Sequence, residues 1–299
     1  GFQCLQENAS WEIEPKGKYY VTRNGSSIIA FVMPESVEGF HIVASHSDSP
    51  TFKIKEIPEI GVNGKYTKLN VEGYGGMIMS TWFDRPLSVA GRILVRTEQG
   101  VETRLVNVDK DLLMIPNLAI HMNRGTNDGY KYNIQKDLLP LYGMGDAKDT
   151  FMDVVAESVS VETSKIMGHD LVLYPRVRGR VWGKDEAFIS SPRLDDLQSV
   201  FASLKGLIIS DNNPQVSMIA VLDNEEVGSS TKQGADSDFL KETVYRICKV
   251  CGIAEEDRRS IFSSSFMISA DNAHAAHPNY MEKADAENRP FMNEGIVIK

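Results

Sequence analysis

Residues 216–226 read Val216-Ser-Met-Ile-Ala-Val-Leu-Asp-Asn-Glu-Glu226, an unbroken apolar run that ends in acidic side chains. A short apolar run with polar residues at its end is typical of a strand that is buried on both faces. Three further runs have this character, at residues 27–33, 41–45 and 266–270. Because helical patterns separate the later runs, we predict an α/β fold with a largely parallel, covered sheet.

The clearest predicted helix begins after Asp195. Apolar residues recur there at helical spacing, namely Leu197, Val200, Phe201, Leu204 and Leu207. This spacing predicts a single apolar stripe that packs against the core.

Between about residue 54 and residue 165 the pattern changes to short alternating segments, at 65–71, 87–96 and 101–107, which Gly and Asn residues separate. Alternation of this kind predicts strands with one buried face. We therefore predict an inserted β-rich domain at 54–165, between the first part (1–53) and the second part (166–299) of the main domain. The chain contains no internal repeat, which argues against a solenoid.

Composition excludes several classes of protein. The 299 residues are 42% apolar and 24% charged, as in ordinary folded proteins. No apolar run approaches the roughly 20 residues that a membrane-spanning helix needs. The 32 basic and 41 acidic side chains give a net charge of −9, and no basic run could contact phosphates. We expect a soluble protein that binds neither membranes nor nucleic acids.

Three cysteines, Cys4, Cys248 and Cys251, are an odd number in a chain without a secretory segment. This usage argues against a disulfide framework and predicts a reducing compartment, with the cytoplasm as the default. Cys248 and Cys251 form a C-x-x-C pair inside a helical pattern at 239–250. A helix face is favoured over a redox or zinc motif there.

Groups that can bind metals follow three of the four apolar runs. His46-Ser-Asp48 follows the second run, Asp223-Asn-Glu-Glu226 the third, and Asp271-Asn-Ala-His274 the fourth. In an open α/β sheet the carboxyl ends of the strands line one crevice. We therefore expect these groups to converge in space.

His46 and Asp48 are two residues apart, so in an extended chain they project from one face and the carboxylate can orient the imidazole. A plain surface loop is the alternative for this pair. The adjacent carboxylates of Glu225 and Glu226 cannot both point the same way. One could bind a metal while the other acts as a general base, and a solvated acidic turn is the alternative.

Asp195 and Asp196 stand directly before the predicted helix. Aspartate is a good amino-terminal cap, and capping is the interpretation that position alone favours. The alternative is a carboxylate shared between two metal ions, which requires the rigid backbone that a packed helix start provides. Donor groups from His, Asp and Glu without Cys favour zinc, manganese or cobalt.

Six ordered motifs together resemble those of the aspartyl aminopeptidase family, in its bacterial type. They are His46-Ser-Asp48, Thr81-Trp-Phe-Asp-Arg85, Ile115-Pro-Asn-Leu-Ala-Ile-His-Met-Asn-Arg124, Ser191-Pro-Arg-Leu-Asp-Asp196, Asp223-Asn-Glu-Glu-Val-Gly228 and Ser269-Ala-Asp-Asn-Ala-His274-Ala-Ala-His-Pro-Asn279. The resemblance implies a dinuclear zinc aminopeptidase that removes amino-terminal residues, acidic ones in particular, from peptides.

The resemblance also implies roles for single residues. Asp195 is similar to the aspartate that bridges the two metal ions, which are expected to be zinc, with manganese or cobalt as alternatives. His46 and Asp271 resemble the remaining ligands of one metal, and Glu226 resembles a ligand of the other. Glu225 resembles the general base.

Four further residues match family positions: Asp48, which would orient His46, and His121, His274 and Lys299. His274 and Lys299 would hold an acidic substrate side chain. His121 would reach the active site of a neighbouring subunit, because the family uses its inserted domain to build dimers that assemble into a dodecamer. Without the resemblance, a packed strand or turn residue would be the preferred interpretation of His121.

The family's last metal ligand is a histidine beyond the equivalent of Lys299, and the family begins with a helix that precedes the equivalent of Gly1. We expect this chain to lack both segments, with one metal site left incomplete. Two other functions therefore stay open: an inactive fragment whose role is assembly, and a metal-dependent amidohydrolase of the same fold.

Overall fold

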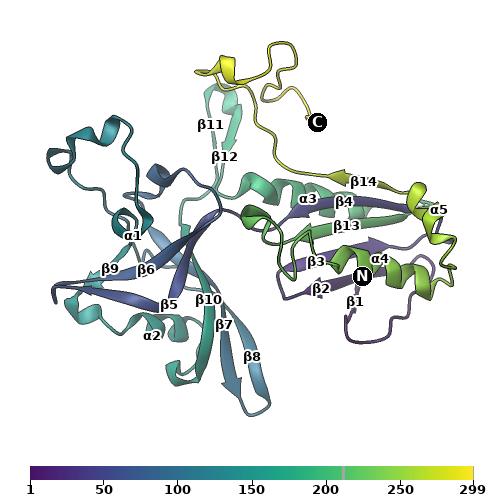
Figure 1. Ribbon diagram of the computed structural model, residues 1–299, viewed down its shortest axis with the longest axis horizontal. Helices are drawn as coiled ribbons and strands as arrows, with labels where there is room; N and C mark the ends of the chain where they lie inside the picture. The colour runs from purple at the N-terminus through teal and green to yellow at the C-terminus, as the bar shows by residue number, and fades with distance from the viewer. Residues whose placement is uncertain (211–212, 299) are drawn as a thin grey trace. The chain divides into compact units, whose positions relative to one another are not determined.

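The computed structural model describes residues 1–210 and 213–298 (Figure 1). The chain divides into two compact units. The first unit comprises residues 1–48 and the described residues from 193 onward, and the second comprises residues 49–192. Among the described residues, no helix has the length and apolar character needed to cross a membrane.

The first unit is built on a mixed sheet with the strand order β1-β2-β3-β13-β4-β14. Its strands are β1 Gln3–Leu5, β2 Lys18–Arg23, β3 Ser27–Val32, β4 Phe40–His46, β13 Val216–Leu222 and β14 Phe266–Ser269. All four predicted strands are present. β4 lies parallel to both β13 and β14, whereas β3 is antiparallel to β2 and β13. The α/β class is confirmed, and the parallel part of the sheet is the part that carries the candidate site.

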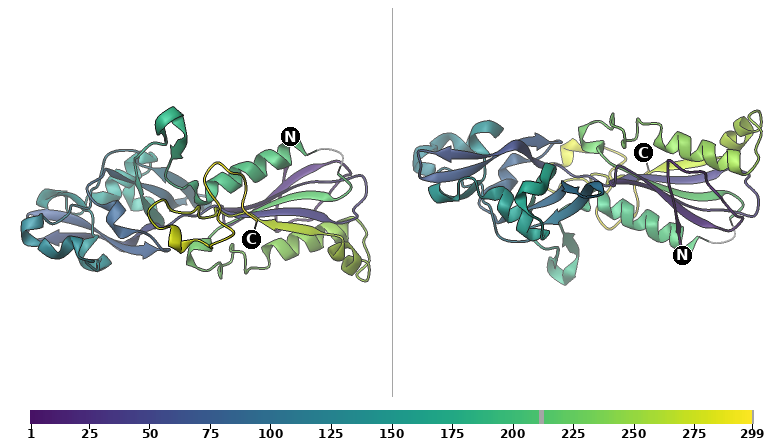
Figure 2. Two further views of the ribbon diagram at one scale, coloured as in Figure 1. Left: turned by 90° about the horizontal axis from the view of Figure 1, so that it is seen from above. Right: turned by 90° about the horizontal axis from the view of Figure 1, so that it is seen from below.

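Helices cover both faces of this sheet. Figure 2 shows α3 Leu194–Ile209 on one face and α4 Phe239–Val250 on the other, with α5 Arg258–Ser263 following α4. The residues of β13 alternate between two apolar clusters: Met218 and Ala220 pack with residues of α4, and Ile219 and Val221 pack with Leu207 of α3. A strand buried on both faces requires the unbroken apolar run seen in the sequence.

The predicted apolar stripe of α3 is wrong in part. Leu207 is buried, but Leu197 and Leu204 are exposed and Phe201 is 65% exposed. The face that meets the sheet contains small and polar residues as well, because Asp196 and Ser203 are also buried on it.

The second unit contains a six-stranded antiparallel sheet in the order β8-β7-β10-β5-β6-β9. Its elements are β5 Thr51–Val62, β6 Tyr66–Tyr74, β7 Leu87–Thr97, β8 Gly100–Asn107, α1 Ile134–Asp137, β9 Leu141–Met144, α2 Phe151–Ser158 and β10 Ile166–Pro175, followed by the hairpin of β11 Arg180–Trp182 and β12 Phe188–Ser190. The unit is β-rich, and it extends beyond the predicted bounds of 54–165 on both sides. Its role in dimerisation stays a prediction.

Cys248 is buried in α4, and Cys251 is exposed directly after the helix. Both thiols are free. The pair therefore occupies a helix end, as the sequence pattern favoured.

Asp170 in the second unit gives a test of stability against pH. Its carboxylate lies 2.7 Å from Lys53 Nζ and 3.3 Å from an Arg92 guanidinium nitrogen. Burial alone would raise the pKa of Asp170, but the two cations outweigh burial and lower it. A carboxylate with a lowered folded-state pKa stabilises the fold above its unfolded pKa of about 3.9, and this stabilisation is lost as the pH falls through the folded-state pKa.

We therefore expect Asp170→Asn to lower the free energy of unfolding at pH 7, and the difference from the unmodified chain to shrink as the solution is acidified below pH ~4. Urea unfolding across that pH range measures it. Asp185→Asn is the matched control, since that side chain is 82% exposed and 3.9 Å from Lys184. An equal loss at every pH would assign the effect to packing rather than charge.

Candidate metal centre

The polar ends of the three parallel strands lie at one edge of the sheet of the first unit. Leu222 of β13 pairs with His46 of β4, and Ser269 of β14 pairs with Ala44. The amide of Ala270 donates to the carbonyl of Ala44 at 2.7 Å, so the pairing extends beyond the end of β14. The residues that follow β4, β13 and β14 are thus brought to the same level, as expected for parallel strands.

A first cluster gathers around His46. His46, Asp195, Asp196 and Asp271 each offer one ligand atom, and these atoms all lie within 4.8 Å of one another. His46 Nε2 is 3.3 Å from Asp195 Oδ1. The two adjacent aspartates stand at the entry to α3, where both have non-helical backbone dihedrals. The irregular entry directs side chains from the helix start toward the strand end.

Asp196 was not among the predicted site residues. Its side chain is fully buried, and its Oδ2 accepts a hydrogen bond from the His46 amide at 3.0 Å. Among the described residues, Asp196 Oδ1 has no hydrogen-bond partner although it is buried. The capping interpretation therefore does not describe Asp196, and the residue at the N-cap of α3 is Arg193. In the sequence Asp196 was interpreted only together with Asp195, as a helix cap or a metal carboxylate, and the Ser191–Asp196 motif gave it no role of its own.

A second cluster shares His46 with the loop after β13. Glu225 and Glu226 lie in a short 3-10 turn, Glu225–Val227, and each offers an oxygen within 4.8 Å of the other and of a His46 nitrogen. The sequence pattern suggested that the two carboxylates point different ways. In the structure an oxygen of each carboxylate lies within 4.8 Å of a His46 nitrogen, so both approach the same ring.

Asp48 links the two strand ends. Its Oδ1 lies 3.4 Å from His46 Nδ1, on the opposite side of the ring from Asp195. Its two oxygens also accept hydrogen bonds from the backbone amides of Glu225 at 3.1 Å and Glu226 at 3.2 Å. His46 Nδ1 also lies 3.1 Å from the backbone carbonyl oxygen of Asp48, so the backbone and the carboxylate of Asp48 both contact the imidazole, and the carboxylate holds the backbone of the glutamate pair.

The pKa values of several site residues are shifted because many carboxylates lie close together. Burial alone would lower the pKa of His46, but the surrounding carboxylates, Asp196 foremost, outweigh burial and raise it. Burial, followed by the charge of Glu225, raises the pKa of Glu226 to about 7. Burial and a neighbouring aspartate also raise the pKa of Asp195. The site concentrates negative charge around the buried His46 and Asp196, and cations relieve such repulsion.

The donor set fits divalent metal ions. It consists of one imidazole and five carboxylates without a thiol, and zinc, manganese and cobalt accept such donors. The buried Asp196 Oδ1 without a hydrogen-bond partner is an independent sign that a positive group belongs nearby. The residues present are therefore suited to hold metal.

Of the predicted residues that the structure describes, His121 and His274, like Asp48, belong to neither cluster. His274 is exposed three residues after Asp271. His121 is exposed in the second unit, in the 3-10 turn Ile120–Met122. Lys299 lies outside the described residues.

The model of the family described as aminopeptidase I zinc metalloprotease (M18) matches residues 1–299. The chain belongs to this family. It is therefore a hydrolase of the metalloaminopeptidase class, and the family resemblance seen in the six motifs is confirmed.

Curated relatives of the M18 chain agree. The probable M18 family aminopeptidase 2 of Clostridium acetobutylicum is 46% identical over 308 residues, which cover 100% of this chain and 71% of that protein. The aspartyl aminopeptidase 1 of Schizosaccharomyces pombe is 39% identical over 335 residues, which cover 100% of this chain and 70% of that protein.

Solved structures give the same fold. A component of the Ape4 and Nbr1 complex matches the M18 chain with a TM-score of 0.92 at 37% identity, over 98% of this chain and 62% of that one. The S. cerevisiae mApe1 dodecamer matches with a TM-score of 0.83 at 27% identity, over 98% of this chain and 69% of that one. The M18 chain thus spans between 62% and 71% of the length of these four proteins.

Proposed function

We propose that the chain carries the active site of a two-metal aminopeptidase that prefers acidic amino-terminal residues. The observation that carries the proposal is the convergence of His46 with five carboxylates from three separate segments of one unit. A histidine with several carboxylates is a usual ligand set of cocatalytic hydrolytic metal sites.

In this proposal His46, Asp195 and Asp271 would hold one metal ion, and Asp195 and Glu226 would hold a second. Zinc is the favoured metal, and manganese or cobalt could replace it. Bound divalent ions supply Lewis acidity, which polarises a carbonyl and makes water a stronger nucleophile. Asp196, which accepts from the His46 amide at 3.0 Å, keeps the end of β4 in place.

Glu225 is the proposed general base. It would accept a proton from the attacking water and return it to the leaving amine. Asp48 positions Glu225 and Glu226, because its carboxylate accepts hydrogen bonds from both of their backbone amides. Asp48 also contacts His46. The residue that fixes the glutamate pair is thus also the one that contacts and orients His46.

Two features support a preference for acidic residues. The S. pombe relative is named an aspartyl aminopeptidase, and His274 and Lys299 would pair with an acidic side chain. A solved relative is a dodecamer, which supports self-association. The second unit is the proposed interface, and His121 would act in a neighbouring subunit's site. A cytoplasmic location rests on the three free cysteines. Peptides are the proposed partners, without nucleic acid or membrane.

The proposal is tested by measuring bound metal per chain, particle size, and hydrolysis of aspartate and leucine anilides on one purified sample. We expect about two metal ions per chain, a large particle, faster cleavage of the aspartate anilide, and loss of cleavage after chelation. A large particle without metal-dependent cleavage would favour an assembly fragment. Cleavage of acyl-amino acids alone would favour an amidohydrolase.

A further inference from the structure

We propose that Arg23 and Ser27, which flank the turn between β2 and β3, are positioning residues for Glu225 and Glu226. They hold the segment 223–238, which begins directly after β13 and contains the glutamate pair. The inference rests on the proposed function and adds two residues that touch neither cluster. Both belong to a turn that no metal-binding motif marks in the sequence.

Ser27 contacts two separate parts of the segment 223–238. Its side chain is buried, its Oγ donates to the Gln233 carbonyl at 2.8 Å, and the same oxygen accepts from the Asp223 amide at 2.9 Å. Asp223 is two residues before Glu225. The turn also reaches the other strand end, because Ser47 Oγ donates to the Ser26 carbonyl at 3.2 Å. The turn between β2 and β3 therefore contacts both the segment that follows β13 and the segment that follows β4.

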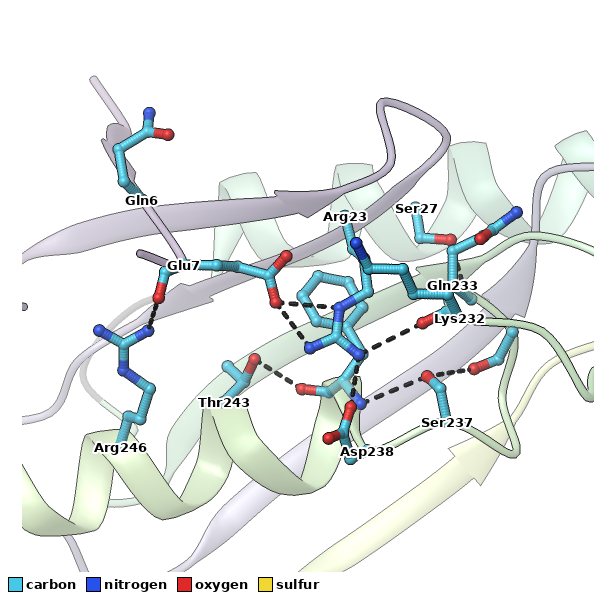
Figure 3. A network of polar contacts seen from close by, with 12 residues as sticks. Gln6, Glu7, Arg23, Ser27, Lys232, Gln233, Ser237, Asp238, Thr243 and Arg246 are labelled. Atoms are coloured by element: carbon cyan, nitrogen blue, oxygen red, sulfur yellow. Dashed lines mark hydrogen bonds and ion pairs between the residues drawn. The ribbon is translucent and has the colours of Figure 1, made fainter. Parts of the chain in front are cut away.

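Arg23 holds the far end of the same loop. Figure 3 shows its guanidinium between Glu7 on one side and Lys232 and Asp238 on the other. Arg23 Nη1 donates to the Lys232 carbonyl at 3.3 Å and to Asp238 Oδ1 at 2.6 Å. The side chain is only 10% exposed and packs on the Phe239 ring at 4.6 Å, so the loop end is tied to a rigid point.

The loop transmits this anchoring because it is folded on itself. Asn224 Oδ1 accepts from Thr231 Oγ1 and Gln233 Nε2, both at 2.7 Å, and the Asn224 carbonyl accepts from the Ser229 amide at 2.8 Å. At Gly234 an added Cβ would lie 2.0 Å from the Ser229 carbonyl oxygen, so the backbone at Gly234 packs directly against the backbone at Ser229. A shift at 232–233 must therefore move Asn224, which directly precedes Glu225.

The competing interpretation is that Arg23 only stabilises the fold, since it also binds Glu7 at 2.6 and 2.9 Å. The amino-terminal segment has a separate attachment, however. Arg246 donates to the carbonyls of Glu7 and Ala9 and packs on Trp11 at 3.9 Å from the ring centroid. The contacts of Arg23 with Lys232 and Asp238 hold the segment 223–238, and its contacts with Glu7 hold the amino-terminal segment. Substitution of the separate partners can therefore distinguish the two roles.

The decisive variant is Ser27→Ala, compared with the unmodified chain by titrating the metal-free protein with Co²⁺ alone. We expect Co²⁺ affinity at one of two sites to fall by about tenfold or more, as for other residues that orient metal ligands. In the metal-loaded protein, kcat for the aspartate anilide should fall while KM changes little. A purely structural role would lower the melting temperature and leave the Co²⁺ affinity of the folded protein unchanged.

A matched pair of variants on the two sides of Arg23 keeps the inference testable if Ser27→Ala does not fold. Asp238→Ala removes the loop-side partner, which is 67% exposed, and Glu7→Ala removes the other partner. We expect only Asp238→Ala to weaken Co²⁺ binding. Equal effects of both variants, or none from either, would overturn the inference.

Failure of the proposed function has a different signature. An unmodified chain that binds two Co²⁺ ions but cleaves no anilide contradicts the aminopeptidase function, while the Co²⁺ titrations still decide the role of Ser27. A chain that binds no Co²⁺ overturns both proposals.

Discussion

Glu225→Gln should reduce kcat for anilide hydrolysis by about 10²–10⁴-fold, the usual contribution of a general base. The amide cannot take a proton from water, yet it has nearly the size of the carboxylate. Because Glu226, Asp195 and His46 remain, bound metal per chain should stay unchanged. Steady-state kinetics and metal analysis on the same sample measure the two quantities.

The control is Glu12→Gln, which neutralises an exposed glutamate of the same unit. It should leave kcat and metal content at the level of the unmodified chain. If Glu225→Gln instead loses metal together with activity, Glu225 is a ligand rather than a base. Glu225 is near enough to be such a ligand, because one of its oxygens lies within 4.8 Å of the ligand atoms of both Glu226 and His46.

His46→Ala should remove the stabilisation by the metal ion that His46 is proposed to hold. His46 is the one residue common to both clusters, and its side chain is buried at their centre. A ligand present at 100 times its dissociation constant stabilises the native state by about 2.7 kcal/mol, and the increment from this ion should vanish when its site loses the imidazole. Thermal unfolding with and without Zn²⁺ measures the increment.

His41→Ala is the matched control for that experiment. His41 lies on the same strand at its other end, where it is exposed and 3.1 Å from Asn213 Nδ2. This variant should keep the full Zn²⁺-dependent shift. A shift of undiminished size in His46→Ala would show that His46 does not bind zinc.

Much of the first unit was predictable because its signals are local. The four apolar runs form β3, β4, β13 and β14, and the chemistry-bearing residues follow three of them. Parallel strands end at one edge, so the proximity of His46, Glu226 and Asp271 follows from topology alone. The apolar stripe of α3 was less predictable, since helical periodicity does not reveal which face meets a sheet.

The sequence by itself determined the α/β class, the family and the residues expected to bind metal, because short motifs and apolar runs encode these directly. The tertiary structure alone decided how those residues are held. Asp48 accepts from the amide of a residue 177 positions away, Asp196 from one 150 positions away, and Ser27 contacts Gln233 across 206 positions. Such hydrogen bonds join side chains to backbone groups that any residue possesses, so they leave no pattern in the sequence and exist only once the strands have packed.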